Sequence, residues 1–183
     1  NAVTYAAQRF GFDHATLTTA DGGRTKAGIT FQLVDCLKTT YSMNGSNTNV
    51  NGWRGSTMRT STMATLLNQL SSDLKSVLKF VNKVTSVGNN SSGLETTSDK
   101  LSLLSEIEVF GATQYSYAGE GKQYEYYTAG NSTIKKVNGS ADYWWERSPY
   151  SGYTYSFCRV ADGGTADFSG ASGSYGVSFG FCV

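Results

Sequence analysis

The first part of the chain alternates between apolar clusters and polar loops. Apolar residues gather around 10–12 and 29–34, and the polar, glycine-bearing sequence DGG lies between them at 21–23. This pattern predicts a hairpin-like excursion. A loop rich in Asn, Ser and Gly follows at 38–55, and Trp53 is its only large apolar residue. We therefore expect Trp53 to anchor this loop.

Helical periodicity follows the loop. Four apolar residues lie at i, i+3, i+4 and i+7 and share one face of a helix: Met63, Leu66, Leu67 and Leu70. We expect that face to pack in the core rather than to bind a ligand. The sequence SSD at 71–73 either ends this helix or caps a further short turn.

The next elements are short. The Val-rich segment 77–86 predicts a strand, the sequence GNNSSG at 88–93 predicts a loop, and KLSLL at 100–104 predicts a buried strand. Ser105 and Glu108 fit a capping box at the start of a short helix. Because short helices come first and short strands last, with long polar loops between them, we expect an α+β domain rather than a βαβ repeat.

A tyrosine-rich segment occupies 115–127. Tyr124 and Tyr127 are three residues apart, as on one face of a helix, and Gly130 suits the end of that helix.

The sequence DYWWERSP at 142–149 is the sharpest local signal. Adjacent tryptophans on a strand point to opposite faces, so one of Trp144 and Trp145 fills the core while the other supports the surface loops. Arg147 carries five donors that suit several loop carbonyls, and Pro149, the only proline, stops the strand. We favour a scaffold corner here over the alternative, in which one indole forms the floor of a ligand pocket.

The tail of the chain, 148–183, differs in composition from the rest. Small residues alternate there with aromatics, and the formal charges are Arg159, Asp162 and Asp167. Lys, Glu, Gln, Met and Trp occupy 26 of the first 147 positions and none of the last 36. Aromatics set among small polar residues are typical of binding loops such as antibody paratopes. A glycine-rich β-meander with small residues in its turns explains the composition equally well.

Length and charge limit the number of domains and the classes of function. At 183 residues the chain is long enough for a single domain, 1–183, with a real core. A net charge of +1 gives no sign of electrostatic capture of nucleic acid, and no apolar run approaches the length of a membrane span. Because the chain begins at Asn1 rather than Met, we expect a fragment of a longer or processed protein.

Residues suited to catalysis are sparse. His14 is the only histidine, and a hydrogen bond in a turn or in the core explains it better than metal binding. Metalloprotease, dithiol redox and nucleotide-binding motifs are absent from the sequence. Cys158 and Cys182 lie in strand-like aromatic contexts; either they form a disulfide, which leaves Cys36 free, or all three are buried thiols. We expect no enzymatic activity, no cofactor and no metal site.

Several stretches together resemble one family. They are WWERSP at 144–149, GWRGSTMR at 52–59, SDKLSLLSEIEVFG at 98–111, SYGVSFGFCV at 174–183, and the upstream FGFDHATL and KAGITFQLVDCL. The combination is similar to bacterial and phage domains with a WW-x-R-S-P signature, which resemble the C-type-lectin-like variable proteins of diversity-generating retroelements. The resemblance covers most of the chain. It implies a C-type-lectin-like fold, shared with formylglycine-generating enzymes, with short helices, a small antiparallel sheet and long loops.

The resemblance also implies a function. In such proteins a reverse transcriptase mutates template adenines, so that AAY codons at the 3′ end of the gene become NNY codons. NNY codons cannot encode Lys, Glu, Gln, Met or Trp, the five residue types missing from 148–183. The implied protein displays a variable region that binds a protein or another cell-surface ligand. It belongs to a phage tail, a bacterial cell surface or the secreted proteins, with homo-oligomers among the expected assemblies.

The family pattern divides the tail into frame and variable positions. The frame comprises 148–150, 157–158, Val160 and 174–182. Between these segments lie the candidate ligand-binding residues: Ser151, Tyr153, Thr154, Tyr155, Arg159, Ala161, Asp162, Thr165, Asp167, Phe168, Ser169 and Ser172. Glu146 departs from the apolar residue that the signature suggests, so we expect it either to be exposed near the site or to mark a divergent member. Calcium-binding motifs of true C-type lectins are absent, which implies recognition by shape and aromatic contact.

We expect binding rather than catalysis, with Tyr153, Tyr155 and Phe168 as aromatic anchors. Two alternatives stay open. A structural module of a phage tail or a surface layer explains the chain without a variable patch. An oxidase resembling formylglycine-generating enzymes would place Cys158 and Cys182 in the reaction.

Overall fold

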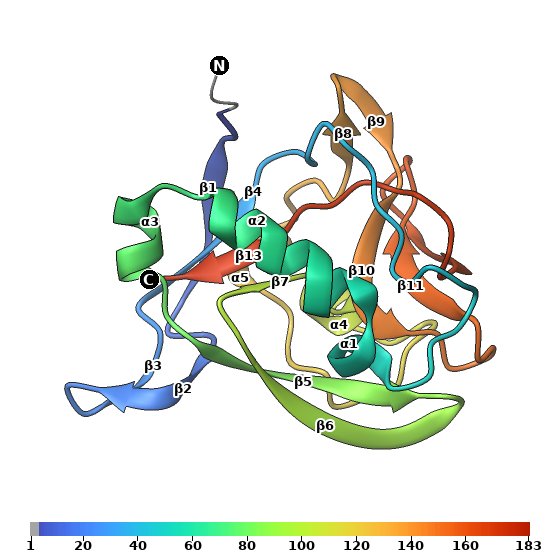
Figure 1. Ribbon diagram of the computed structural model, residues 1–183, viewed down its shortest axis with the longest axis horizontal. Helices are drawn as coiled ribbons and strands as arrows, with labels where there is room; N and C mark the ends of the chain where they lie inside the picture. The colour runs from blue at the N-terminus through green and yellow to red at the C-terminus, as the bar shows by residue number, and fades with distance from the viewer. Residues whose placement is uncertain (1–3) are drawn as a thin grey trace.

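Strands from both ends of the chain meet in the central sheet of the computed structural model, which describes residues 4–183 (Figure 1). Its antiparallel strand order is β1-β4-β13-β7. These strands are β1 (Ala7–Phe12), β4 (Ile29–Leu33), β13 (Gly180–Cys182) and β7 (Leu101–Ser102). The last strand of the chain, β13, therefore lies inside the sheet, between β4 and β7. Asn1 lies outside the described residues.

A second antiparallel sheet has the order β3-β2-β5-β6. Its strands are β3 (Arg24–Lys26), β2 (Thr16–Asp21), β5 (Val81–Gly88) and β6 (Ser91–Asp99). The β2–β3 hairpin confirms the excursion expected around 21–23. The loop predicted at 88–93 is wrong, because only Asn89 and Asn90 form a turn, with φ of 55° and 56°. Two consecutive positive φ angles fit a tight hairpin turn, so β6 continues directly from it.

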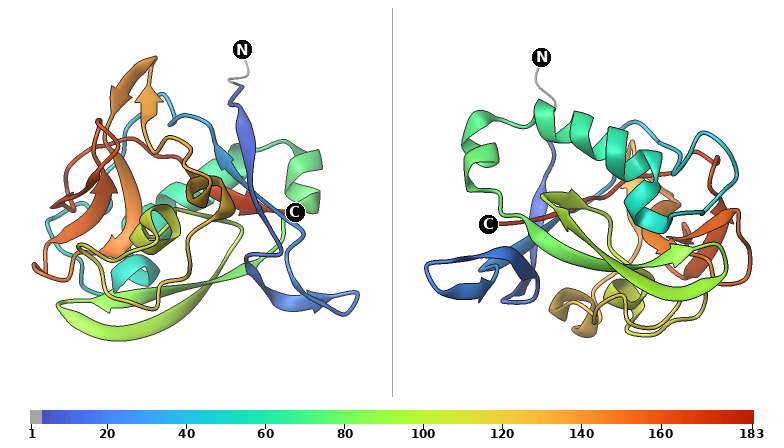
Figure 2. Two further views of the ribbon diagram at one scale, coloured as in Figure 1. Left: turned by 180° about the vertical axis from the view of Figure 1, so that it is seen from behind. Right: turned by 60° about the horizontal axis from the view of Figure 1, so that its bottom comes forward.

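The third sheet is a meander of β10 (Trp144–Pro149), β11 (Ser156–Val160) and β12 (Ala166–Gly170). The separate hairpin of β8 (Lys135–Val137) and β9 (Ser140–Asp142) precedes it. Figures 1 and 2 show the meander at one end of the molecule and the β2–β3 hairpin at the other. Most of the tail thus builds one end of the protein, and β13 returns to the centre.

The helices are short, and their ends follow the local sequence. Ser71 caps the third helix by accepting a hydrogen bond from the Leu74 amide, and Ser105 and Glu108 form the expected capping box. Gly130, with φ of 79°, follows the last helix. The elements are α1 (Gly52–Gly55), the π-helix η1 (Met58–Met63), α2 (Ala64–Gln69), α3 (Ser72–Val77), α4 (Glu106–Phe110) and α5 (Glu125–Thr128). Because α3 reaches Val77, the strand predicted from residue 77 begins only at Val81.

Two main apolar clusters fill the interior. The larger contains Trp53, Trp145 and the predicted helical face of Met63 and Leu66, while Trp144 belongs to the smaller. The two indoles therefore enter different clusters, as the alternation of a strand requires. The protein is a mixed α+β structure of mostly antiparallel sheets with a few short helices. Within residues 4–183, no helix is long and apolar enough to cross a membrane.

Candidate functional site

Five aromatic side chains, Tyr115, Tyr150, Tyr153, Tyr155 and Phe168, gather beside β12 and are here called the aromatic patch. The rings of Tyr150 and Phe168 stack with centroids 4.1 Å apart, and those of Tyr153 and Tyr155 stack at 5.0 Å. Tyr115 meets Phe168 edge to face at 5.1 Å. Tyr153 and Tyr155 remain 45% and 44% exposed. The patch therefore combines a ring-packed base with two rings that face solvent.

A buried amide holds the loop that carries the two exposed tyrosines. The Asn49 side chain, which is 0% exposed, donates to the carbonyls of Tyr150, Tyr153 and Ser156 at 3.3, 2.8 and 2.9 Å. Its own oxygen accepts the amide of Asn89 at 2.8 Å. A fully bonded buried amide fixes the backbone around it, because leaving any of these groups unpaired is costly. The Asn49 side chain thus fixes the backbone of the 150–156 loop.

Tyr115 is held by a buried carboxylate. Glu106, which is 0% exposed, accepts the amide of Tyr115 at 3.0 Å and both the amide and the hydroxyl of Ser116 at 2.8 and 2.6 Å. The Tyr115 carbonyl in turn accepts the amide and hydroxyl of Ser151 at 2.8 and 2.7 Å. These bonds join the segment at 115–116 to the 150–156 loop.

Arg159 and Asp167 lie on the other face of the meander. They are paired across β11 and β12, one position away from the pair of Cys158 and Phe168, and successive strand residues face opposite sides. The guanidinium of Arg159 bonds Asp167 at 2.7 Å, and it lies 4.0 and 4.2 Å from the ring centroids of Tyr143 and Tyr175. With a side chain only 13% exposed, Arg159 is occupied within the protein. The structure does not bring this pair together with the aromatic patch.

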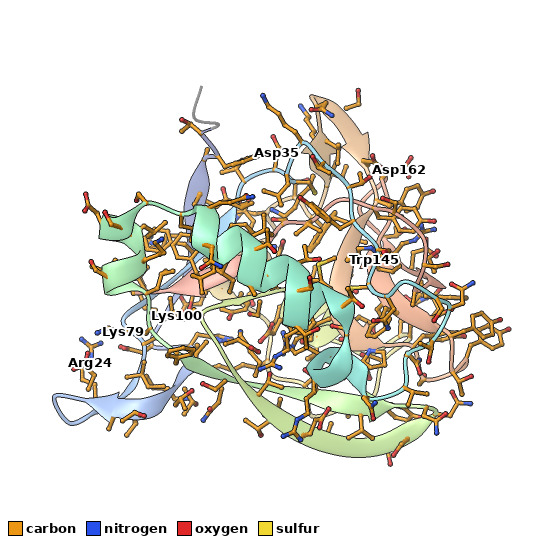
Figure 3. The ribbon with its side chains drawn as sticks, in the orientation of Figure 1. Arg24, Asp35, Lys79, Lys100, Trp145 and Asp162 are labelled. Atoms are coloured by element: carbon orange, nitrogen blue, oxygen red, sulfur yellow. The ribbon has the colours of Figure 1, made fainter. Side chains whose placement is uncertain are left out.

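The remaining predicted ligand-binding residues are spread around the rims of the meander. Ser169 shares a hydrogen bond with the Tyr175 hydroxyl at 3.1 Å, and Ser172 bonds Asn47 at 2.7 Å. Figure 3 shows Asp162 at the outer edge of the molecule, beside the β8–β9 hairpin. The other residues at the rims are Thr154, Ala161 and Thr165, of which Thr154 and Thr165 are exposed and Ala161 is half-buried.

Burial separates the predicted variable positions from the frame. None of the twelve candidates between 151 and 172 is buried. Of the frame, Phe157, Cys158, Val160 and the whole of 176–182 are buried. Ser174 of the frame is exposed, and Tyr150 and Tyr175 are half-buried. Most of the frame is therefore buried, whereas every candidate position is exposed or half-buried.

Arg147 is the centre of a buried hydrogen-bond network that joins β5, α4, β10 and the segments at Leu103 and Glu120. It is 1% exposed, and its N–H groups are all used. They bond one hydroxyl, three carbonyls and one carboxylate: Thr85, the backbone oxygens of Val84, Leu103 and Glu120, and Glu108. Arginine's five donors suit this kind of junction. The two indoles are 0% exposed, and their N–H groups donate to backbone oxygens of Thr133 and Tyr41.

The expectation that Glu146 is exposed is wrong. Its side chain is 0% exposed, and neither carboxylate oxygen has a hydrogen-bond partner within residues 4–183. Desolvation raises its pKa well above the usual value, and the nearby Glu106 and Glu120 raise it further. Because β10 is buried along its whole length, the strand takes Glu146 inward with its neighbours. The core therefore favours the protonated, neutral form of this acid.

The possible disulfide between Cys158 and Cys182 is also wrong. All three cysteines are free and buried, and Cys182 lies 3.3 Å from the Thr30 hydroxyl. Burial raises the pKa of the Cys158 and Cys182 thiols. His14 takes the structural role expected for it, since its Nε2 lies 3.1 Å from the Lys122 carbonyl and its ring stacks on Tyr124. Among residues 4–183, no cluster of His, Cys, Asp and Glu could hold a metal ion.

Comparison with known proteins places these features in a family. Residues 28–183 match the family described as a domain of unknown function (DUF6273). The chain belongs to this family. The matched segment of this DUF6273 domain includes the meander, the 150–156 loop and every residue of the aromatic patch. No curated protein and no solved structure matches the chain.

Four residues that build the patch were not among the sequence-based candidates: Asn49, Glu106, Tyr115 and Tyr150. The tyrosine-rich composition of 115–127 was the only signal for Tyr115, and Tyr150 was assigned to the frame. Nothing local marks Asn49, because the three carbonyls to which its side chain donates lie more than 100 residues away.

Proposed function

We propose that this DUF6273 domain is a ligand-binding display protein whose region 148–183 is diversified by a retroelement. The observation that carries the proposal is the division of the tail by burial. All twelve candidate positions are exposed or half-buried, whereas Phe157, Cys158 and Val160, the frame residues between them, are buried. Substitutions at surface positions usually change stability by only about 0.5 kcal/mol, so such positions can vary while the fold persists.

The composition of the tail supports the same proposal. The five residue types that NNY codons cannot encode are missing from 148–183, although two of them, Trp and Glu, occur in the adjoining WWE at 144–146. The fold does not require this absence, since exposed Tyr, Ser and Thr positions accept Lys or Gln equally well on structural grounds. A coding restriction explains the absence more directly than a packing restriction.

The proposed scaffold is a C-type-lectin-like fold. Short helices, small antiparallel sheets and long loops agree with it, and so does a final strand that returns to the centre of the sheet beside a strand from the start of the chain. We place the protein on a phage tail or a bacterial cell surface, or among secreted proteins, with a protein or cell-surface molecule as its ligand. Homo-oligomeric display is compatible with this role.

Binding would centre on the aromatic patch. Tyr153 and Tyr155 offer two exposed rings on a loop that Asn49 holds in place. Large rigid rings contribute contact area at a low cost in conformational entropy, and a few such residues carry most of the affinity in typical interfaces. Because Arg159 and Asp167 are bonded to each other, they shape the opposite face of β12 rather than act as primary anchors.

The two alternatives have less support. An oxidase would need a reactive thiolate, but the Cys158 and Cys182 thiols are buried and their pKa values are raised. A purely structural module gives no reason for an exposed cluster of stacked tyrosines or for the restricted composition of the tail. Neither alternative accounts for the division by burial.

A matched pair of libraries tests the proposal. One library carries NNY codons at the twelve candidate positions, and the other carries NNY codons at twelve buried positions of the frame. We expect most members of the first library and few of the second to resist protease during surface display. Equal loss of folded protein in both libraries would contradict the proposal.

A further inference from the structure

A second concave site lies on the molecule, apart from the aromatic patch. A cavity of about 360 Å³ opens between β2, β5 and the loop at 119–122. No residue of the aromatic patch lines it. The residues that matter for its chemistry are His14, Lys26, Lys83, Glu108, Lys122 and Arg147.

Positive charge dominates the cavity. Four cationic side chains line it, against two carboxylic acids, Glu108 and Glu120. Glu108 is already bonded to both Arg147 and Lys83, and these two cations lower its pKa to about 2. Desolvation raises the pKa of Glu120 to about 7, so this group is partly neutral at physiological pH. The cavity therefore keeps a net positive charge at neutral pH.

Three of the cations have hydrogen-bond donors to spare. Lys26 Nζ donates to the Thr16 hydroxyl at 2.7 Å and to the His14 carbonyl at 3.4 Å, which leaves one of its three N–H groups free. The Lys122 ammonium at the exposed rim donates to no group within residues 4–183. Lys83, only 5% exposed, makes two hydrogen bonds, to Glu108 Oε1 at 3.2 Å and to the Tyr124 hydroxyl at 3.1 Å. An ammonium has three donors, so one N–H of Lys83 is free for a ligand. Arg147 has none left and serves as structure.

The wall of the cavity is held in a fixed shape. The His14 ring stacks on Tyr124 with centroids 3.8 Å apart, and its Nε2 lies 3.1 Å from the Lys122 carbonyl. Gly121 has φ of 124°, and a Cβ there would lie 3.2 Å from the Glu108 side chain. The loop backbone thus passes close over the floor of the cavity, which keeps Lys122 at the rim.

We propose that this cavity binds a small organic oxyanion, a metabolite-sized molecule with a phosphate or carboxylate group. Lys122 and Lys26 approach the anion at the rim, and Lys83 donates to it from the floor. Hydrogen bonds from ammonium groups to such anions are roughly twice as strong as neutral ones. A partly enclosed site strengthens them further, because solvent screens them less.

Titration of the ¹⁵N-labelled protein at low ionic strength tests the site, with inorganic phosphate in one arm and succinate in the other. We expect saturable shifts of the Gly119, Gly121 and Lys122 amides, and the arm with the lower dissociation constant identifies the group. The variant K26M/K122M should weaken that binding by about tenfold or more. The variant K75M/K136M, which removes one half-buried and one exposed lysine outside the cavity, should not.

Circular dichroism of the two double variants checks that each is folded. Shifts that rise linearly without saturation in both arms would overturn the proposal. Equal affinity in K26M/K122M and K75M/K136M would also overturn it, since binding would then follow overall charge alone. Loss confined to K26M/K122M supports the cavity.

Discussion

Glu146 offers the sharpest perturbation of the core, because its two oxygens are buried without a hydrogen-bond partner in the described chain. The change Glu146→Met keeps the length of the side chain and removes both polar atoms. Each unsatisfied buried polar group costs about 1–3 kcal/mol, so we expect the variant to be more stable by about 2 kcal/mol. For a chain of this size each kcal/mol raises Tm by about 2–4 °C.

The gain in stability from Glu146→Met depends on pH, and the direction of that dependence follows from the pKa shift. The pKa of Glu146 is raised in the folded protein, so the folded state binds the proton more tightly than the unfolded state does. Its contribution to stability is complete below the unfolded pKa near 4.5 and is lost as the pH rises toward the folded pKa. Each pH unit in that window costs about 1.4 kcal/mol. The advantage of Glu146→Met should therefore grow as the pH rises above 5 toward the folded pKa.

Two further buried acids, Glu120 and Glu108, also change the free energy of unfolding with pH. Glu120, with a pKa of about 7, adds a second loss of stability between about pH 4.5 and 7. Glu108, with a pKa of about 2, acts in the opposite direction, because its ion pairs are lost as the pH falls from 4.5 toward 2. The protein should therefore be most stable near pH 4–5.

Urea denaturation at pH 5, 6, 7 and 8 measures these effects. Glu125→Met, at an exposed position, is the matched control and should keep the pH dependence of the original protein. A Glu146→Met variant that keeps the same dependence, or that is less stable at pH 8, would refute the account of Glu146 as a neutral buried acid.

Three further predictions concern the scaffold and the patch. Arg147→Met leaves Glu108 without its main partner and should cost about 3–5 kcal/mol of unfolding free energy, measured by urea denaturation. Asn49→Ala frees the carbonyls of the 150–156 loop, so hydrogen exchange of that loop should accelerate while β13 stays protected. Replacing Tyr153 and Tyr155 together with Ala should leave Tm within about 2 °C of the original, since both rings are half exposed. A large fall in Tm would instead make these tyrosines part of the core.

Features with a local cause could be predicted from the sequence. The capping box of Ser105 and Glu108, the glycine after α5 and the opposite directions of Trp144 and Trp145 all depend on residues close together in the chain. The strand β6 was missed, because its mostly polar residues lack the apolar alternation that marks a half-buried strand.

Long-range contacts could not be predicted in this way. The placement of β13 between β4 and β7 pairs residues about 150 and 80 positions apart, and local periodicity carries no information on such pairing. Glu146 was misplaced because charge usually indicates exposure, whereas its strand is buried on both faces. Likewise, in the sequence alone Asn49 is one more polar residue of a loop. Its hydrogen bonds to the 150–156 loop become visible only in the structure.

The central claim is that the surface of 148–183 varies while its frame is fixed. Sequencing the 3′ end of the gene and its flanks across several isolates tests this most directly. The account predicts substitutions confined to adenine-matched codons between Ser151 and Ser174, beside a near-copy repeat and a reverse transcriptase gene. A uniform tail with no repeat nearby would contradict it.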